Sequence, residues 1–247
     1  MSKSKARSKK AYSKKDSKIL YLEETLMNNA IAVTDHRNNK ELSIHDLKEF
    51  KAVTEPLRQM IEAYAQGFNI LALGSAGTAK TTCAMYLALS DILSKESPRD
   101  TIVIVRSIVE GRESGFKPGT AEEKLEPYMD AYHDVVAQLT GKATAFENFI
   151  KQGKIVCRST GILRSLNWRN SVIVFDEIQN ANLNELSTVV TRAARGSRII
   201  AIGDSKQDDL IYSKYDTSRL GDFSKIIETI PEYFNIIKFR TEDLLRS

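Results

Sequence analysis

The sequence of 247 residues has few of the residues that build metal centres or disulfide frameworks. Its two cysteines, Cys83 and Cys157, lie far apart and form no CxxC pair, so the sequence predicts neither a zinc site nor a disulfide framework. The three histidines, at positions 36, 45 and 133, share no spacing typical of metal ligands. So little cysteine fits a reducing compartment, and we expect a cytoplasmic protein.

Long apolar runs are also absent. No stretch approaches the roughly 20 residues that a helix needs to span a bilayer. Glu23 and Glu24 interrupt the segment in which the apolar part of a signal peptide would lie, so we expect neither a signal peptide nor a membrane helix. With 42% hydrophobic and 28% charged residues, the composition is that of a globular protein able to bury the core of one domain.

Acidic residues are scarce in the first 18 positions, where eight Lys or Arg stand against Asp16 alone. The rest of the chain has 28 basic and 31 acidic residues, so the basic character belongs to the tail. Because a Ser/Lys-rich arm cannot build a core, we expect residues 1–18 to be disordered. Two interpretations of this tail stay open, namely non-specific attraction to a nucleic-acid backbone and a solubilising role.

Short apolar runs alternate with helical segments along the remaining chain. The sequence predicts strands at Phe68–Leu73, Thr101–Arg106, Lys154–Cys157, Ser171–Phe175, Arg198–Ile202 and Asn235–Phe239. It predicts helices at Leu57–Gln66, Thr81–Leu93, Leu125–Leu139 and Leu183–Ala194. This alternation is typical of an α/β fold with a mostly parallel, doubly wound sheet. We expect this domain at residues 54–247, after a helical and loop extension at residues 19–53.

Glycine is scarce as well, yet the segment Gly74–Thr81 reads GSAGTAKT directly after the first predicted strand. A strand, a glycine-containing turn and a helix N-terminus together direct backbone N–H groups and a partial positive charge at phosphates. Lys80 then reaches the β- and γ-phosphates, and the Thr81 hydroxyl ligates Mg²⁺. We expect the phosphates to bind at Gly74, Ser75, Ala76, Gly77, Thr78, Ala79, Lys80, Thr81 and Thr82.

Ala79 stands where the phosphate-loop pattern has its second glycine. If the loop requires a positive φ there, alanine costs roughly 1 kcal/mol relative to glycine. The alternative interpretation is a chance glycine-rich turn that binds nothing.

Two further predicted strands end in polar motifs. Ser171–Phe175 is followed by Asp176 and Glu177, which we expect to hold Mg²⁺ and to orient or deprotonate the attacking water, respectively. Arg198–Ile202 is followed by a Gly-Asp pair and then by Gln207, placed to report the γ-phosphate. A surface Asp-Glu pair that caps a helix and an ordinary Gly-Asp turn are the alternatives.

With these motifs the chain resembles the PhoH family of predicted ATPases, and particularly the PhoH-like proteins of tailed phages. The resemblance covers roughly residues 54–247. It rests on GSAGTAKT, VRSIVEGRESGFKPGTAEEKLEPYMDAY, GILRSLNWRNSVIVFDEIQNA, IIAIGDSKQDDL and RTEDLLRS. It implies a P-loop NTPase of the RecA or superfamily-one helicase kind, with one core. Ala79 departs from the glycine usual in this family.

The resemblance also implies residue roles. Lys80, Glu177, Gln207 and Arg246 correspond to catalytic positions, with Arg246 as an arginine finger. Gln179 corresponds to a nucleotide-sensing glutamine, and Thr81 and Asp176 to the metal ligands. An adenine-contacting glutamine falls near Gln59. A single core needs a neighbouring subunit to complete its site, which implies a homo-oligomer, a hexameric ring. Arg164, Arg192 and Arg240 are weaker candidates for the finger.

The segment Val105–Gly119 corresponds to a stretch that contacts single-stranded nucleic acid in helicase-like cores. Its Arg106, Arg112, Phe116 and Lys117 supply charge and a stacking ring. A loop that only covers the core is the alternative.

The sequence leaves two functions open. The first is a Mg²⁺-dependent ATPase that couples hydrolysis to binding or remodelling of RNA or DNA, as a helicase does. The second is a non-hydrolysing nucleotide-binding or protein-interaction module. Either one is expected in the cytoplasm, or in the host cytoplasm for a phage-encoded protein.

Overall fold

The computed structural model describes residues 42–107, 121–160, 168–204 and 220–245. The predicted disordered tail (1–18) and residues 19–41 of the predicted extension lie outside these residues. Residues 43–247 form one compact unit. It begins with a short 3₁₀ helix, η1 (Ile44–Asp46), and a loop. In the described part of the chain, no helix is both long and apolar enough to cross a membrane.

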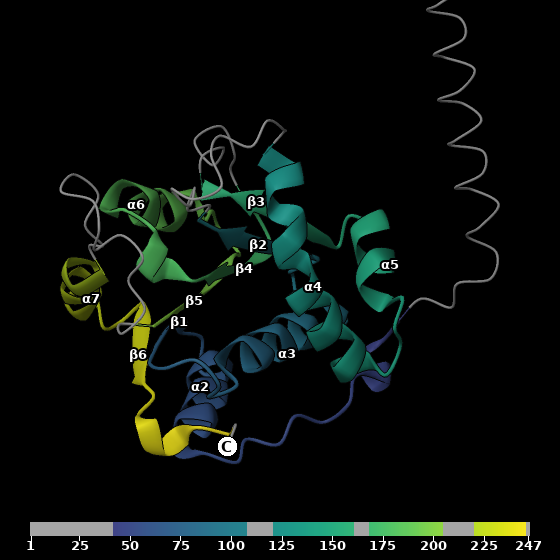
Figure 1. Ribbon diagram of the computed structural model, residues 1–247, viewed down its shortest axis with the longest axis horizontal. Helices are drawn as coiled ribbons and strands as arrows, with labels where there is room; N and C mark the ends of the chain where they lie inside the picture. The colour runs from purple at the N-terminus through teal and green to yellow at the C-terminus, as the bar shows by residue number, and fades with distance from the viewer. Residues whose placement is uncertain (1–41, 108–120, 161–167, 205–219, 246–247) are drawn as a thin grey trace, which may run out of the picture. The chain divides into compact units, whose positions relative to one another are not determined.

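The core of this unit is a sheet of six described strands, and every pairing within it is parallel (Figure 1). The strands are β1 (Asn69–Leu73), β2 (Thr101–Arg106), β3 (Ile155–Ser159), β4 (Ser171–Asp176), β5 (Arg198–Gly203) and β6 (Phe234–Lys238). Their order is β3-β2-β4-β5-β1-β6, so β5 separates β1 from β4. Each strand lies within two residues of its predicted bounds, because short β-branched runs suit a strand buried on both faces.

Helices cover both faces of the sheet, which confirms the doubly wound α/β prediction (Figure 1). One face packs against helices that contact β1 to β5, and the other against a cluster that joins Leu71, Val105 and Phe175 to the last two helices. On the first face lie α2 (Glu55–Ala65), α3 (Lys80–Leu93), α4 (Ala121–Thr140) and α5 (Ala145–Lys151), and on the second α6 (Leu183–Arg192) and α7 (Leu220–Glu228).

Two of these helices, α5 and α7, were not predicted from the sequence. The seven residues of α5 make only two turns, too few for a helical period to stand out. Helix α7 is amphipathic and buries Leu220, Phe223 and Ile227, which are spaced three and four residues apart. The sequence signal for α7 was therefore present.

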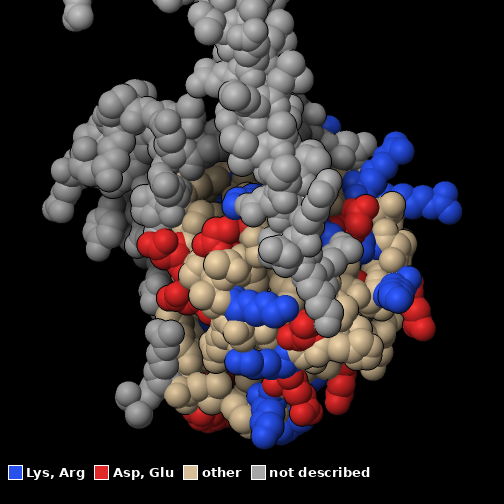
Figure 2. All heavy atoms as spheres, turned by 90° about the vertical axis from the view of Figure 1, so that its right-hand side faces the viewer, with Lys and Arg blue, Asp and Glu red and all other residues tan. Residues whose placement is uncertain are grey.

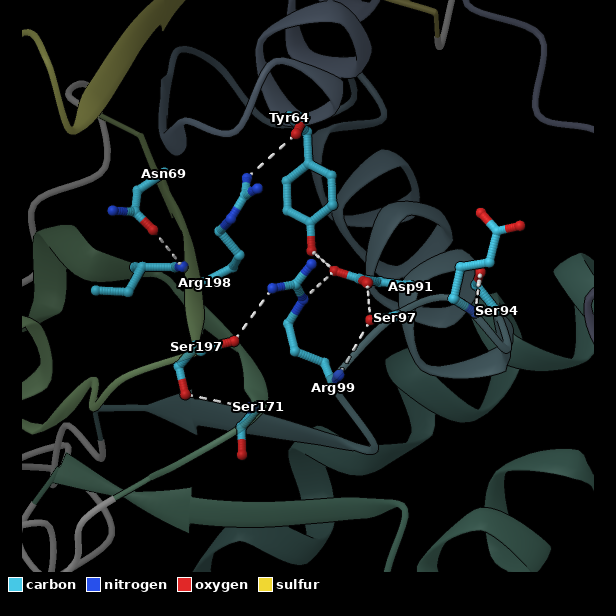
Figure 3. A network of polar contacts seen from close by, with 12 residues as sticks. Tyr64, Asn69, Asp91, Ser94, Ser97, Arg99, Ser171, Ser197 and Arg198 are labelled. Atoms are coloured by element: carbon cyan, nitrogen blue, oxygen red, sulfur yellow. Dashed lines mark hydrogen bonds and ion pairs between the residues drawn. The ribbon is translucent and has the colours of Figure 1, made fainter.

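A buried polar network ties the loops at the amino ends of the strands (Figure 3). The Asp91 carboxylate, at the end of α3, accepts hydrogen bonds from Tyr64 Oη, Ser97 Oγ and Arg99 Nε. Arg99 also donates to the carbonyl of Gly196, at 3.1 Å. Only 8% of the Asp91 side chain and 15% of the Arg99 side chain are exposed. Breaking this ion pair therefore leaves the Arg99 charge without its carboxylate partner in a mostly buried environment.

We predict that Asp91→Ala lowers the free energy of unfolding by about 3 kcal/mol at neutral pH, because Arg99 keeps its charge and loses its carboxylate partner. Urea denaturation followed by circular dichroism measures this loss. The matched control is Glu55→Ala, which breaks the exposed Glu55–Arg58 pair (2.9 Å) and should cost less than about 1 kcal/mol. Equal losses in the two variants would contradict the prediction.

The same network predicts a pH dependence. Burial alone would raise the pKa of Asp91, but hydrogen bonds from Arg99, Ser97 and Tyr64 outweigh it, and the pKa is lowered. A carboxyl with a depressed pKa stabilises the fold above its unfolded pKa of about 3.9, and this contribution is lost as the pH falls through the folded pKa. The stability difference between wild type and Asp91→Ala should therefore narrow in urea titrations as the pH drops below about 4.

Candidate functional site

The loop between β1 and α3 packs closely against the chain that follows β6. A Cβ atom on Gly74 would lie 2.3 Å from the carbonyl oxygen of Phe239, so only glycine fits there. The loop ends at Ala79, which precedes the first residue of α3 with φ 61° and ψ 21°. Ala79 therefore occupies the left-handed region that glycine adopts without steric cost. From the sequence we expected alanine to be less favourable than glycine here only if the loop required a positive φ. The observed φ angle of Ala79 meets that condition.

Lys80 opens helix α3, and its side chain folds back into the loop. The ammonium donates hydrogen bonds to the carbonyls of Gly74 (2.8 Å) and Ser75 (2.7 Å) and to Thr78 Oγ1 (3.1 Å). Burial lowers the pKa of Lys80, although the charges of Asp204, Asp176 and Glu177 act in the opposite direction. The loop thus encloses a cation where the pattern predicts a phosphate-binding lysine.

Asp176, the last residue of β4, faces the start of α3. Its Oδ2 accepts hydrogen bonds from Tyr132 Oη (2.8 Å) and, more weakly, from Thr81 Oγ1 (3.4 Å). A carboxylate beside a hydroxyl is a donor set that Mg²⁺ prefers, so the residues present fit the cation that the sequence predicts. Tyr132 on α4 is fully buried and was not predicted as a site residue, although it lies in one of the segments that carry the family resemblance.

Glu177 follows Asp176 in a left-handed backbone conformation, with φ 54°. Its carboxylate accepts a hydrogen bond from Gln179 Nε2 and lies 3.9 Å from Arg106 Nη2. Burial, followed by the charge of Asp176, raises the pKa of Glu177. A raised pKa makes a carboxylate a better proton acceptor, and strained backbone in a non-glycine residue is typical of functional positions.

Gln179 and Asp204 connect the ends of β4 and β5 to the phosphate loop. The amide oxygen of Gln179 accepts from the backbone N–H of Asp204 (2.9 Å), while its nitrogen binds Glu177. Asp204 Oδ2 accepts from the backbone N–H of Ala76 in the loop (3.0 Å). Gln179 is buried, its amide is held between Glu177 and Asp204, and it does not line the cavity over the loop.

Arg106 belongs to this site, although the sequence grouped it with nucleic-acid contacts. Its guanidinium lies 4.5 Å from the centre of the Tyr128 ring and forms the ion pair with Glu177. Arg112, Phe116 and Lys117 lie outside the described residues. The position of Arg106 at the carboxyl end of β2, beside β4, brings it to the carboxylates.

A cavity of about 570 Å³ opens over the phosphate loop and joins these groups. It is lined by the loop from Ala76 to Thr82 without Thr78, by Arg106, Asp176, Glu177 and Asp204 at the strand ends, by part of α4, and by Leu245. Gln207, Arg246 and Arg164 lie outside the described residues. Arg192, Arg240 and Gln59 are described but do not line this cavity, and Gln59 instead donates to Glu55 on the exposed side of α2 (3.3 Å).

Residues 49–247 match the family of PhoH-like proteins. The chain belongs to this family. A PhoH-like protein of Synechocystis is 31% identical over 161 residues, which are 65% of this chain and 48% of that protein. A PhoH-like protein of Bacillus subtilis is 29% identical over 66% of this chain and 50% of its own, and protein PhoH of Escherichia coli is 29% identical over 72% and 49%.

This PhoH-like chain therefore spans about half the length of the curated relatives it matches. The predicted family is confirmed, and the particular resemblance to phage proteins stays a prediction. A solved structure of Pif1 helicases on forked double-stranded DNA aligns with a TM-score of 0.35 and 15% identity over 77% of this chain and 44% of that one. A likeness this slight carries no conclusion about function.

We predict that Ala79→Gly raises the free energy of unfolding by up to about 1 kcal/mol, because glycine adopts the left-handed conformation without a Cβ clash. Chemical denaturation measures the gain. The control is the same exchange at Ala137 inside helix α4, where glycine should instead cost about 0.5 to 1 kcal/mol. Destabilisation at both positions would show that Ala79 is not strained.

Proposed function

We propose that this PhoH-like protein is a Mg²⁺-dependent ATPase that couples ATP hydrolysis to binding or remodelling of single-stranded RNA or DNA. One observation carries the proposal. The ammonium of Lys80 and the carboxylates of Asp176 and Glu177, from segments about 100 residues apart, line one cavity at the carboxyl ends of parallel strands. Ligands bind in open α/β sheets at this edge.

Lys80 is the phosphate-binding group in this proposal. It now donates to loop carbonyls and a threonine hydroxyl, and these hydrogen bonds can be exchanged for stronger ones to anionic phosphate oxygens. The N-terminus of α3 adds its partial positive charge on the same side. Both contributions favour the polyphosphate of a nucleotide over its neutral nucleoside.

Thr81 and Asp176 would hold the cation, which supplies charge neutralisation on the β- and γ-phosphates. Glu177 orients the attacking water and accepts its proton as the new P–O bond forms. The bond between the γ-phosphorus and the β–γ bridging oxygen breaks, and the electron pair leaves with ADP. Gln179 holds the Glu177 carboxylate for this role, since its amide bridges that carboxylate to the end of β5.

We further propose that the site is completed by a neighbouring subunit in a hexameric ring. An arginine stabilises the charge that develops on the γ-phosphoryl group in the transition state. In enzymes that use such an arginine finger it accelerates the reaction by about 10³- to 10⁵-fold. Arg246 is the proposed finger on the strength of the sequence motif, and Gln207 the proposed γ-phosphate sensor. Arg106 already lies beside Glu177 within the same chain.

Nucleic acid is proposed as the partner from the basic residues 1–18 and the segment after β2. Figure 2 shows one face of the molecule, the right-hand side of Figure 1, and there basic and acidic side chains are interspersed. Among the described residues on that face, no uniformly basic surface is available to a phosphate backbone. The tail and the segment after β2 are the proposed contact regions, in a protein proposed to act in the cytoplasm.

One observation favours a second function, a nucleotide-binding module that does not hydrolyse. Ala79 holds the loop in a conformation that glycine would adopt more readily, and the strain falls on the residue before Lys80. Phosphate release from ATP by the purified protein, with and without single-stranded RNA or DNA at low salt, separates the two functions. Stimulation by one polymer would establish the ATPase and identify its substrate.

We predict that Glu177→Gln keeps ATP binding and lowers phosphate release by about 10²-fold or more, because the amide cannot accept the proton of the attacking water. Fluorescent-nucleotide binding and a phosphate-release assay give the two values. The matched control is Glu62→Gln on the exposed side of α2, which should change neither. Equally slow release by wild type and Glu177→Gln would rule out hydrolysis and leave the binding module.

We also predict that Tyr132→Phe raises the Mg²⁺ concentration needed for ATP binding by about tenfold, because Asp176 loses the hydroxyl that holds its Oδ2 in place. A Mg²⁺ titration of nucleotide binding measures the shift. Tyr86→Phe, which changes a phenol stacked on Phe50 away from this cavity, is the control. An unchanged Mg²⁺ requirement would show that Tyr132 only packs.

A further inference from the structure

The segment that follows β6, Phe239–Leu245, crosses the phosphate loop, and we refer to it as the C-terminal strap. Its first residue donates a backbone hydrogen bond from Phe239 N to the carbonyl of Leu73, at 2.7 Å. Its last donates from Leu245 N to the carbonyl of Gly77 in the middle of the loop, at 3.1 Å. The strap is therefore fastened at both ends, before the loop begins and at its turn.

Phe239 makes further contacts with the loop. Its carbonyl oxygen and Cβ fill the space that a side chain on Gly74 would need, and the centre of its ring lies 5.6 Å from Lys80 Nζ. The strap thus touches the loop at the residues that must position a phosphate group. Because the strap contacts the loop directly, a ligand bound at the loop would also lie next to the strap.

The strap lies at the opposite side of the loop from the carboxylates. In the sheet, β1 has β5 and then β4 on one side and β6 on the other. Asp176 ends β4, and Glu177 and Asp204 directly follow β4 and β5, whereas the strap continues β6. A triphosphate with its γ-phosphate and cation beside Asp176 and Glu177, as proposed above, would leave the loop with its nucleoside on the side of the strap.

Leu245 is the strap residue that lines the cavity. It lines the cavity with Gly77 and Thr82 and is 45% exposed, while Leu244, which is 40% exposed, does not line it. An apolar side chain left half-exposed beside a cavity that contains charged groups has surface to bury on a ligand. The ligand group that offers an apolar face at this end of a nucleotide is the base.

We propose that Leu245 on the C-terminal strap forms the base-binding surface of the nucleotide site. This inference rests on the function proposed above. A leucine offers contact area and no hydrogen-bonding group, so it recognises the face of a purine and not its edge. The subsite therefore binds adenine and guanine nucleotides with affinities within about tenfold of each other. Strong discrimination between the two bases would require polar groups in the subsite that the wrong base leaves without a hydrogen bond.

The test compares a nucleotide with its phosphate tail alone. Isothermal titration calorimetry measures the binding of ATP, GTP and tripolyphosphate, each with Mg²⁺, to the full chain. Leu245→Ser should weaken ATP and GTP about tenfold and leave tripolyphosphate within about twofold of wild type, because only the nucleotides carry a base. Leu244→Ser is the matched control and should change none of the three. Leu245→Met, which restores an apolar surface, should bind like wild type.

Each result decides the proposal. Unchanged ATP affinity in Leu245→Ser places the base elsewhere, and equal weakening of ATP and tripolyphosphate shows that the strap only supports the loop. A preference of wild type for ATP over GTP by more than about 100-fold contradicts recognition through an apolar face. If wild type binds neither ATP nor tripolyphosphate, the proposed function itself fails. Thermal unfolding of each variant identifies a folding defect, in which case Leu245→Ala replaces Leu245→Ser.

Discussion

The parallel hydrogen bonding of β1 to β5 and of β5 to β4 is the constraint on which the rest of the site depends. Each pairing fixes a register, Leu73 opposite Gly203 and Phe175 opposite Ala201, so the three strands end at one edge of the sheet. The phosphate loop, the Gly-Asp turn and the Asp-Glu pair are then neighbours whatever their separation in sequence. A parallel sheet buried on both faces is rigid, and it gives the polar groups at its edge little freedom to move.

Polar contacts at the carboxyl edge join these strand ends into one unit. Asp204 binds the loop through Ala76, Gln179 joins Asp204 to Glu177, and Tyr132 and Thr81 share one oxygen of Asp176. At the opposite edge, the hydrogen bonds of Asp91 and Arg99 join the loops that precede the strands. The sheet is therefore held by polar networks at both edges and by apolar packing between them. These hydrogen bonds hold the polar groups of the site in place, which suits preorganised electrostatic stabilisation of a developing charge.

The sequence predicted what is encoded locally. The six strands follow from short apolar runs, and the phosphate loop and Asp-Glu pair follow from motifs of a few residues at strand ends. It did not predict Tyr132, the site role of Arg106 or Leu245, because each joins the site through contacts with segments 44 to 168 residues away. Such distant pairs leave no local period or spacing in one sequence. Ala79 was predictable in part: the motif identified the position, and the φ angle in the structure showed that its backbone is strained.

The place of β1 in the sheet bears on the order in which the protein is made. Both neighbours of β1, which are β5 and β6, are synthesised more than 120 residues after it. A nascent chain that already contains the phosphate loop cannot yet hydrogen-bond the strand that supports it. Closing such long loops is entropically costly and slow, and it completes late. A site built on β1, β5 and β6 is therefore completed only after the last of these strands has been made.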